Sequence, residues 1–176
     1  GMRRGEACGL RWSDIDWRQR ALHIRRNVVK LSGQPILVKE PKTRAGVRVV
    51  YLSKELCKLL RVWQKESVWE KEQRGEGGLE EEDYLFRQPG GDSRVPGTFT
   101  FRFKKILQEG DLPDNLNVHS LRHTNASMLI AQGVDVRTVA GLLGHAQPGT
   151  TLDIYSHAFD KNKKLAQEKL AEAMGL

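Results

Sequence analysis

The spacing of apolar residues changes near residue 52, and this change most constrains the fold. Before it, alternating and β-branched residues predict short strands over 21–30, 36–39 and 47–52, separated by brief turns. Three consecutive strands with short connections predict an antiparallel meander. After it, apolar residues recur at helical intervals. We therefore expect an α+β fold, mostly α, with a small three-stranded antiparallel sheet near the N-terminus.

Two stretches of the second part predict amphipathic helices. Ser53 is a suitable N-cap for a helix that runs to about residue 74. Its apolar stripe consists of Leu56, Leu59, Leu60 and Trp63. Residues 98–109 predict a further helix whose inward side chains are Phe99, Phe103, Ile106 and Leu107. From Ser120 onward the sequence is predominantly helical, with a glycine stop at Gly144.

The composition fits one globular domain over residues 1–176. Hydrophobic residues make up 39% and charged residues 29% of the chain, and no apolar run reaches the ~20 residues of a membrane span. The N-terminus lacks the apolar segment of a secretory signal. Cys8 and Cys57 have no paired spacing, which excludes a disulfide framework and a cysteine zinc site. These features predict a cytoplasmic protein without a membrane partner.

Positive charge is concentrated in the first third of the chain. Residues 1–51 carry twelve Lys and Arg against four Asp and Glu, whereas residues 52–92 carry seven against ten. Nucleic acid is the natural partner for such an asymmetry, because neutralised phosphates release counterions. The alternative is an ordinary, mildly basic protein that binds no nucleic acid.

Three short motifs lie in the last third. His119 and Arg122 are three residues apart, so on a helix they share one face and could bind a single anion. Gly144 is followed directly by His145, and Tyr155 lies ten residues further on. Each motif alone has an ordinary interpretation, as a helix cap, a surface arginine or a core tyrosine. Only their combination predicts a site.

Taken together, these motifs closely resemble the C-terminal signature of the tyrosine recombinases, or phage integrases. The matching segments are HSLRHT at 119–124, LGH at 143–145 and TTLDIYSH at 150–157. Residues 1–16 are similar to the family's first arginine box, and PKTR at 41–44 resembles the hairpin that carries the family's catalytic lysine. The resemblance covers essentially the whole chain, with its motifs in the family's order.

The resemblance implies a catalytic site in which every family position is filled by the expected residue type. The site would consist of Arg3, Lys42, His119, Arg122, His145 and Tyr155. Tyr155 would attack a DNA phosphodiester, forming a 3'-phosphotyrosyl bond and releasing a 5'-hydroxyl. The arginine forks would bind the non-bridging oxygens as charge develops on them. His119 is the expected base, Lys42 the expected acid, and His145 a further hydrogen-bond donor.

The resemblance also implies partners. We expect double-stranded DNA as substrate and a homo-oligomer on DNA, in the form of a tetrameric synapse, assembled through a helix at 160–174. The apolar stripe of that helix consists of Leu165, Leu170, Ala173 and Met174. No cofactor or metal is expected, because two arginines, a lysine and histidines already surround the phosphate and the histidines lack paired zinc spacing.

Two functional alternatives remain at this point. The chain is expected to be a catalytic domain truncated at its N-terminus, without the family's separate DNA-binding domain. It could instead be a non-catalytic DNA-binding module that keeps the fold, or an enzyme similar to type IB topoisomerases.

Several charged residues near the motifs also have two interpretations. Glu6 either supports Arg3 or is an ordinary carboxylate of the first helix. His123 and His157 are expected to give only supporting hydrogen bonds. Four arginines either contact phosphates or are solvated strand residues, namely Arg25, Arg26, Arg44 and Arg48.

Overall fold

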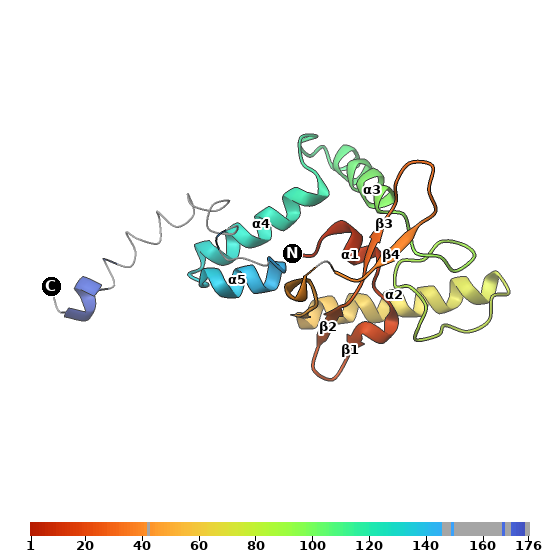
Figure 1. The fold of residues 1–176 in the computed structure, drawn as a ribbon, viewed down its shortest axis with the longest axis horizontal. Coiled ribbons are helices and arrows are strands. Elements are labelled where there is room, and N and C mark those ends of the chain that lie inside the picture. The colour runs from red at the N-terminus through yellow and green to blue at the C-terminus, as the bar shows by residue number, and fades with distance from the viewer. Residues whose placement is uncertain (42, 146–148, 150–166, 168–169, 175–176) are drawn as a thin grey trace.

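The structure is a computed structural model, and it describes residues 1–41, 43–145, 149, 167 and 170–174. Its elements, in chain order, are α1 (Arg4–Cys8), η1 (Trp12–Asp14), β1 (Ile15–Asp16), β2 (Ala21–Ile24), β3 (Asn27–Val29), β4 (Leu37–Lys39), η2 (Arg44–Gly46), β5 (Arg48–Tyr51), α2 (Lys54–Gln73), α3 (Pro96–Glu109), α4 (Val118–Ala131) and α5 (Val136–Leu143). The predicted α+β fold with a small antiparallel sheet is confirmed (Figure 1).

The strand pairing differs from the predicted meander. The three-stranded sheet has the order β1-β2-β5, and β3 pairs with β4 in a separate two-stranded sheet. The strand predicted over 21–30 is therefore wrong as one element, because it divides at Arg25 and Arg26 into β2 and β3. Arg26 donates a hydrogen bond to the buried carboxylate of Asp14 at 2.8 Å. This side chain thus serves an internal ion pair where the chain passes from one sheet to the other.

Two apolar clusters support the described part of the chain. The larger cluster fills the space between the sheet β1-β2-β5 and α2, around the fully buried Ile24. The smaller one joins α4 to α5 through Ala126, Ile130, Val139 and Leu143. Helix α5 also contacts β5, and α1 contacts β3 and α3. These contacts bring α1, β5 and the end of α5 together, although they are far apart in sequence.

Helix α2 begins as predicted but presents a different face to the core. Ser53 Oγ accepts a hydrogen bond from the backbone N–H of Leu56 at 3.1 Å, which confirms the N-cap. Leu60 and Trp63 pack on the core as expected, whereas Leu56 is exposed and Leu59 is 66% exposed. Trp63 Nε1 donates to the carbonyl of Leu85 at 2.8 Å and thereby fixes the rotation of the helix.

Helix α3 shows the same kind of difference. Leu107 is buried as predicted, but Ile106 is exposed, so its predicted inward position is wrong. Apolar residues lie on more than one face of both helices, and spacing alone does not select the face that packs. No helix among the described residues is both long enough and apolar enough to cross a membrane.

The orientation of α2 can be tested with two neighbouring leucines. Leu60→Ala should lower the free energy of unfolding by about 2 kcal/mol, because it leaves a gap beside the core. Leu59→Ala removes the same atoms from the exposed face and should change that free energy by less than about 0.5 kcal/mol. Urea unfolding of both variants measures the difference, and equal losses would contradict this orientation.

Candidate active site

Arg3 stands at the start of the short helix α1. Its backbone N–H donates to Glu6 Oε2 at 2.7 Å, and its Nη1 donates to Glu6 Oε1 at 2.9 Å. Glu6 occupies the third helical position, where a carboxylate can accept from the unpaired N–H at the helix start. The Arg3 side chain is 43% exposed. Glu6 therefore holds Arg3 at both its backbone and its guanidinium, and the side chain is still exposed enough to reach an anionic ligand.

Helix α4 positions His119 and Arg122. Asn117 caps the helix, and its Oδ1 accepts from the backbone N–H groups of His119 at 2.9 Å and Ser120 at 3.0 Å. His119 lies in the first turn and is exposed. Arg122 is 4% exposed and donates to the carbonyls of Gly1 at 2.5 Å and Leu143 at 2.6 Å. The capped helix start thus presents an imidazole beside a buried guanidinium.

Helix α5 ends in a glycine turn that leads directly to His145. Gly144 has φ 68° and ψ 41°, a left-handed conformation that favours glycine. The backbone N–H of His145 donates to the carbonyl of Ala140 at 3.0 Å and closes the turn. A Cβ atom at Gly144 would also lie 2.7 Å from Arg48 Nη1. Both the backbone conformation and the close arginine therefore require glycine here.

The last three carbonyl groups of this turn each accept from a different arginine. Arg48 Nε donates to Leu142 at 2.7 Å. Arg122 donates to Leu143, and Arg3 Nη2 donates to Gly144 at 3.3 Å. A helix C-terminus carries partial negative charge and carbonyls without helical partners, so cations are stabilised there. The end of α5 is consequently the point around which the arginines gather.

The two histidines keep their neutral form under this positive charge. Burial, together with His123, Arg122 and Arg3, lowers the pKa of His119. Burial, together with Arg122, Arg3 and Arg48, also lowers the pKa of His145. The rings of His119 and His123 meet edge to face, with their centroids 4.5 Å apart. Near pH 7 each imidazole can therefore accept a proton or donate its single N–H.

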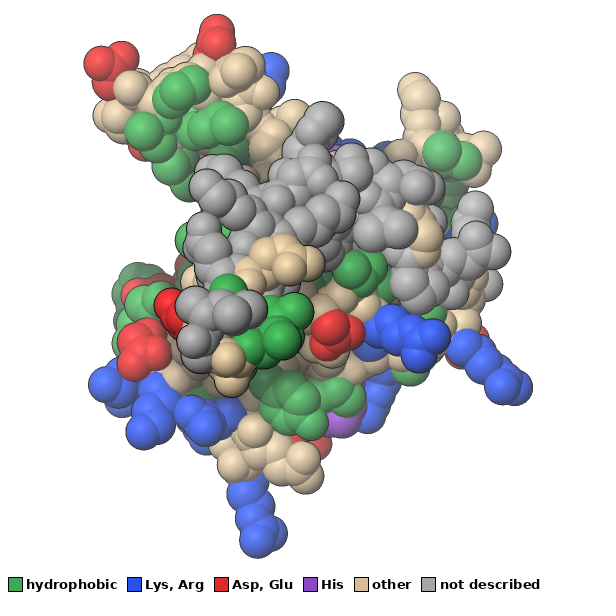
Figure 2. Space-filling model, turned by 90° about the vertical axis from the view of Figure 1, so that its left-hand side faces the viewer, with side chains coloured by type: hydrophobic (Ala, Val, Ile, Leu, Met, Phe, Trp, Pro, Cys, Tyr) green, Lys and Arg blue, Asp and Glu red, His purple; other side chains and the backbone are tan. Residues whose placement is uncertain are grey.

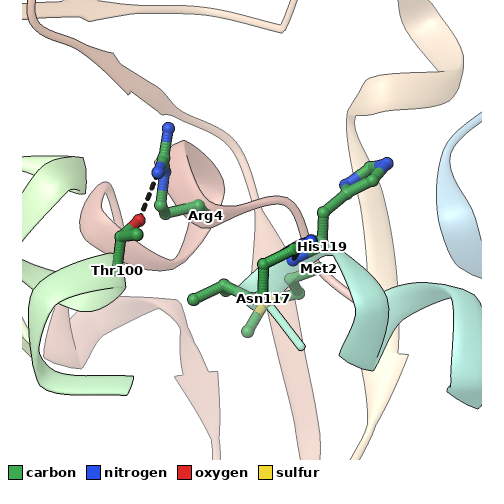
Figure 3. Close-up of a pocket in the computed structure, with 6 residues that line it drawn as sticks. Met2, Arg4, Thr100, Asn117 and His119 are labelled. Atoms are coloured by element: carbon green, nitrogen blue, oxygen red, sulfur yellow. Dashed lines mark hydrogen bonds between the residues drawn. The ribbon is translucent and has the colours of Figure 1, made fainter. Parts of the chain in front are cut away.

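A cavity of about 340 Å³ opens beside His119. Figure 3 shows Arg4 of α1 linked by a hydrogen bond to Thr100 Oγ1 of α3 on one side, and His119 of α4 on the other. Met2, Asn117 and Val118 complete the lining. A cation and a hydroxyl thus border the space next to the exposed imidazole.

Four of the six predicted site residues lie around one point. Arg3, His119, Arg122 and His145 come from α1, α4 and the end of α5 and interact through the contacts above. Lys42 and Tyr155 lie outside the described residues, as do His157 and Leu165 of the sequence analysis. The segment predicted as a hairpin around Lys42 instead connects β4 to β5, which belong to different sheets.

Arg48 differs from both of its sequence-based interpretations. Its side chain is 6% exposed and pairs with Glu6, Nη2 to Oε2, at 2.8 Å. It is therefore neither a solvated strand residue nor placed to contact a phosphate. The sequence did contain an indication of this position. In a strand with alternating side chains, Arg48 lies on the same inward face as Val50.

Glu6 supports Arg3, as one of its two sequence-based interpretations predicted. It is buried between Arg3 and Arg48. Burial alone would raise the pKa of Glu6, but the hydrogen bonds from Arg48 and Arg3 outweigh it and hold that pKa below its usual value. The carboxylate therefore stays charged at neutral pH.

The described residues near the end of α5 bring together cationic side chains and neutral imidazoles. Among them, no group of three or more His, Cys, Asp or Glu side chains could hold a metal ion. Two guanidinium groups and two neutral imidazoles suit a bound phosphate, whose oxygens accept paired hydrogen bonds.

Known proteins resemble this chain over almost its full length. The ICEBs1 integrase of Bacillus subtilis (strain 168) is 32% identical over 99% of this chain and 46% of that protein. A XerC-like tyrosine recombinase of Caldanaerobacter subterraneus subsp. tengcongensis is 31% identical over 97% of this chain and 46% of that protein. The chain thus spans about half the length of the curated relatives it matches.

Solved structures show the same fold. The Tn1549 transposon integrase in complex with transposon right end DNA superposes with a TM-score of 0.77 at 23% identity, over 96% of this chain and 54% of that one. The XerA recombinase gives a TM-score of 0.64 at 22% identity, over 94% of this chain and 52% of that one. The profile of the Phage integrase family matches residues 1–162. With nearly the whole chain covered and relatives above 30% identity, this protein belongs to the phage integrase family.

Proposed function

We propose that this chain is the catalytic domain of a site-specific DNA recombinase, which cleaves and rejoins DNA strands through a 3'-phosphotyrosyl intermediate. The observation that carries the proposal is the convergence of Arg3, Arg122, His119 and His145 at the end of α5. The names of the relatives, integrase and tyrosine recombinase, support strand exchange over relaxation by a topoisomerase-like enzyme. They equally disfavour a non-catalytic module.

The arginines act on the phosphate. When Tyr155 attacks, negative charge grows on the non-bridging oxygens of a pentavalent phosphorus. Arg3 offers a half-exposed planar donor that its bonds to Glu6 and Gly144 fix in advance, so little reorganisation accompanies the reaction. Arg122 adds the positive charge of its buried guanidinium, which donates to Gly1 and Leu143. The N–H of His145 adds a further donor.

Two proton transfers complete the cleavage. The Tyr155 oxygen bonds to phosphorus as its proton passes to His119, and the bond from phosphorus to the 5'-oxygen breaks as Lys42 supplies a proton to that oxygen. The phosphotyrosyl bond conserves the energy of the broken phosphodiester. A 5'-hydroxyl from another strand can then reverse the steps, and no nucleotide cofactor or metal takes part.

Double-stranded DNA is the proposed substrate, which implies a cytoplasmic location in a bacterial cell. The basic first third of the chain supplies charge for the backbone, and Arg4 beside Thr100 suits a phosphate next to the scissile one. On the face drawn in Figure 2, Lys and Arg side chains stand mainly in the lower half, at the lower left, the bottom and the right.

The nucleophile can be tested by covalent trapping. A duplex nicked beside the scissile phosphate loses its short 5'-hydroxyl fragment after cleavage, so the adduct cannot reverse. The wild-type protein should form an adduct that survives denaturation, and Tyr155→Phe should form none, because it lacks the attacking oxygen. Tyr51→Phe, at an exposed position on β5, is the matched control and should form the adduct normally. An adduct with Tyr155→Phe would contradict the assignment.

The role of His119 predicts a pH dependence of the single-turnover cleavage rate. An ordinary imidazole is half protonated near pH ~6.5. Because the pKa of His119 is lowered, the neutral base persists at that pH, and the rate should fall only at more acidic values. His23→Gln, on β2, should keep this profile, whereas His119→Gln should be slower at every pH. A half-maximal rate at or above pH ~6.5 in the wild type would contradict a lowered pKa.

We further propose that residues 160–174 assemble protomers on DNA, up to a tetrameric synapse. Leu170 and Met174 belong to the predicted apolar stripe, and both are exposed in the structure. Exposed apolar residues at helical spacing, such as these two, suit a groove on a neighbouring protomer. The competing arrangement is a helix folded back on its own domain.

Deleting residues from Leu165 onward separates these two arrangements. If the helix acts on a neighbour, the shortened protein should keep the melting temperature of the monomer and lose cooperative assembly on DNA, as measured by gel shift. A fall of several degrees in that melting temperature would place the stripe in the protein's own core instead.

A further inference from the structure

We propose that Arg48 is a positioning residue of the active site, which orients Arg3 and the His145 turn without itself touching DNA. The inference deepens the proposed recombinase function and rests on it. Its basis is one buried guanidinium that bonds to three separate segments. These are the arginine box at Glu6, the carbonyl end of α5 and the loop that precedes β5.

All three nitrogens of the Arg48 guanidinium are engaged inside the protein. Nε donates to Leu142 at 2.7 Å, and Nη2 donates to Glu6 Oε2 at 2.8 Å. Nη1 donates to Glu6 Oε1 at 3.1 Å and to the carbonyl of Gly46 at 3.2 Å. The side chain is also buried, at 6% exposed. Its effect on a phosphate must therefore pass through other residues.

The link to Arg3 passes through both oxygens of Glu6. Oε1 accepts from Arg3 Nη1 and Arg48 Nη1, while Oε2 accepts from the Arg3 backbone N–H and Arg48 Nη2. Two guanidinium groups share one carboxylate, which leaves one net positive charge in the cluster. Without Arg48, the negative charge of Glu6 would be paired with Arg3 only, and that pair would carry no net charge. Arg48 thus leaves the charge of Arg3 available for an incoming phosphate.

The links to the other two segments restrain His145 and the loop around Lys42. The Arg48 bond to Leu142 lies three residues before His145, and the absence of a side chain at Gly144 admits the guanidinium. On the other side, Gly46 packs so closely on Pro41 that an added Cβ would lie 2.4 Å from the Pro41 Cβ. The Arg48 bond to Gly46 therefore restrains described residues that flank position 42 in the sequence.

A lysine could not reproduce this arrangement. An ammonium group can pair with Glu6, but it lacks the planar fork that spans a carboxylate and also reaches a carbonyl on the far side. The geometry accordingly predicts that Arg48→Lys keeps the charge and only part of the positioning, whereas Arg48→Met loses both.

The test measures single-turnover cleavage of the nicked duplex at saturating DNA, at a temperature where every variant is folded. Arg48→Met should cleave about 100-fold more slowly and Arg48→Lys about 10-fold more slowly, as for residues that orient a reacting group. DNA affinity should change by less than about threefold, because Arg48 touches no phosphate and Arg3 acts mainly on charge that develops in the transition state. A rate loss without an affinity loss separates positioning from binding.

Arg87→Met is the matched control. Arg87 is also a buried arginine, and it pairs with Glu76 away from the site. Its loss should lower the melting temperature like that of Arg48 and leave the cleavage rate within about threefold of the wild type. Slow cleavage in both variants would mean that Arg48 acts only through stability, which would overturn the inference.

A double-mutant comparison identifies the route. If Arg48 acts through Glu6, then Glu6→Gln combined with Arg48→Met should be about as slow as Arg48→Met alone. If the rate loss of the double variant equals the product of the losses of the two single variants, the route through Glu6 is overturned. If folded Arg48→Met cleaves at the wild-type rate, the positioning role is overturned. If Arg48→Met does not fold, Arg48→Lys decides, since an unchanged rate in that variant would equally overturn it.

Absence of an adduct with the wild-type chain would concern the proposed function and would leave the positioning role to a separate measurement. The positioning role is then decided by nuclear magnetic resonance, on the Arg3 Nε–H signal and the ring signals of His145. Both should shift in Arg48→Lys and stay unchanged in Arg87→Lys. Unchanged signals in Arg48→Lys would overturn the inference.

Discussion

The buried carboxylate of Glu6 is the interaction on which the arrangement of this protein depends. An unpaired charge in that position would be strongly destabilising, by about 3 to 5 kcal/mol. Glu6 avoids this cost only when Arg3 and Arg48 both reach it, and these residues lie at the start of α1 and on β5. Satisfying one buried charge therefore brings the first arginine box against the sheet and fixes the guanidinium that faces a ligand.

The carbonyl groups at the end of α5 also need partners, and arginines supply them as they do for Glu6. Helix ends leave carbonyls without partners, and here Arg48, Arg122 and Arg3 donate to three consecutive ones. Each arginine thus stabilises the fold and carries charge toward the site. Because one set of contacts serves both purposes, the geometry of the site and the stability of the domain are coupled. Burial, together with the positive charge gathered there, lowers the pKa of His119 and of His145 and so keeps both imidazoles neutral near pH 7.

Local signals in the sequence predicted the elements better than their packing. Ser53 caps α2 as expected, because a cap depends on neighbours within one turn. The packed face of α2 and the pairing of β2 and β3 could not be predicted in the same way. Leu59 and Leu60 are equally apolar, and contacts outside the helix, such as the Trp63 bond to Leu85 and the Lys71 bond to Asp83, select its rotation. Strand pairing likewise depends on partners distant in sequence, since β2 pairs with β5 and β3 with β4.

The sequence by itself determined the types, order and spacing of the motif residues, and hence the family. It placed His119 and Arg122 on one helix face, because three residues make about one turn. Only the tertiary structure decided that Arg48 turns inward onto Glu6, 42 residues away, and that three arginines meet at the end of α5. The physical reason is that the sequence predicts a charged side chain on a strand to be exposed to solvent unless its buried partner is known. That partner is brought to it by the packing of α1, β5 and α5.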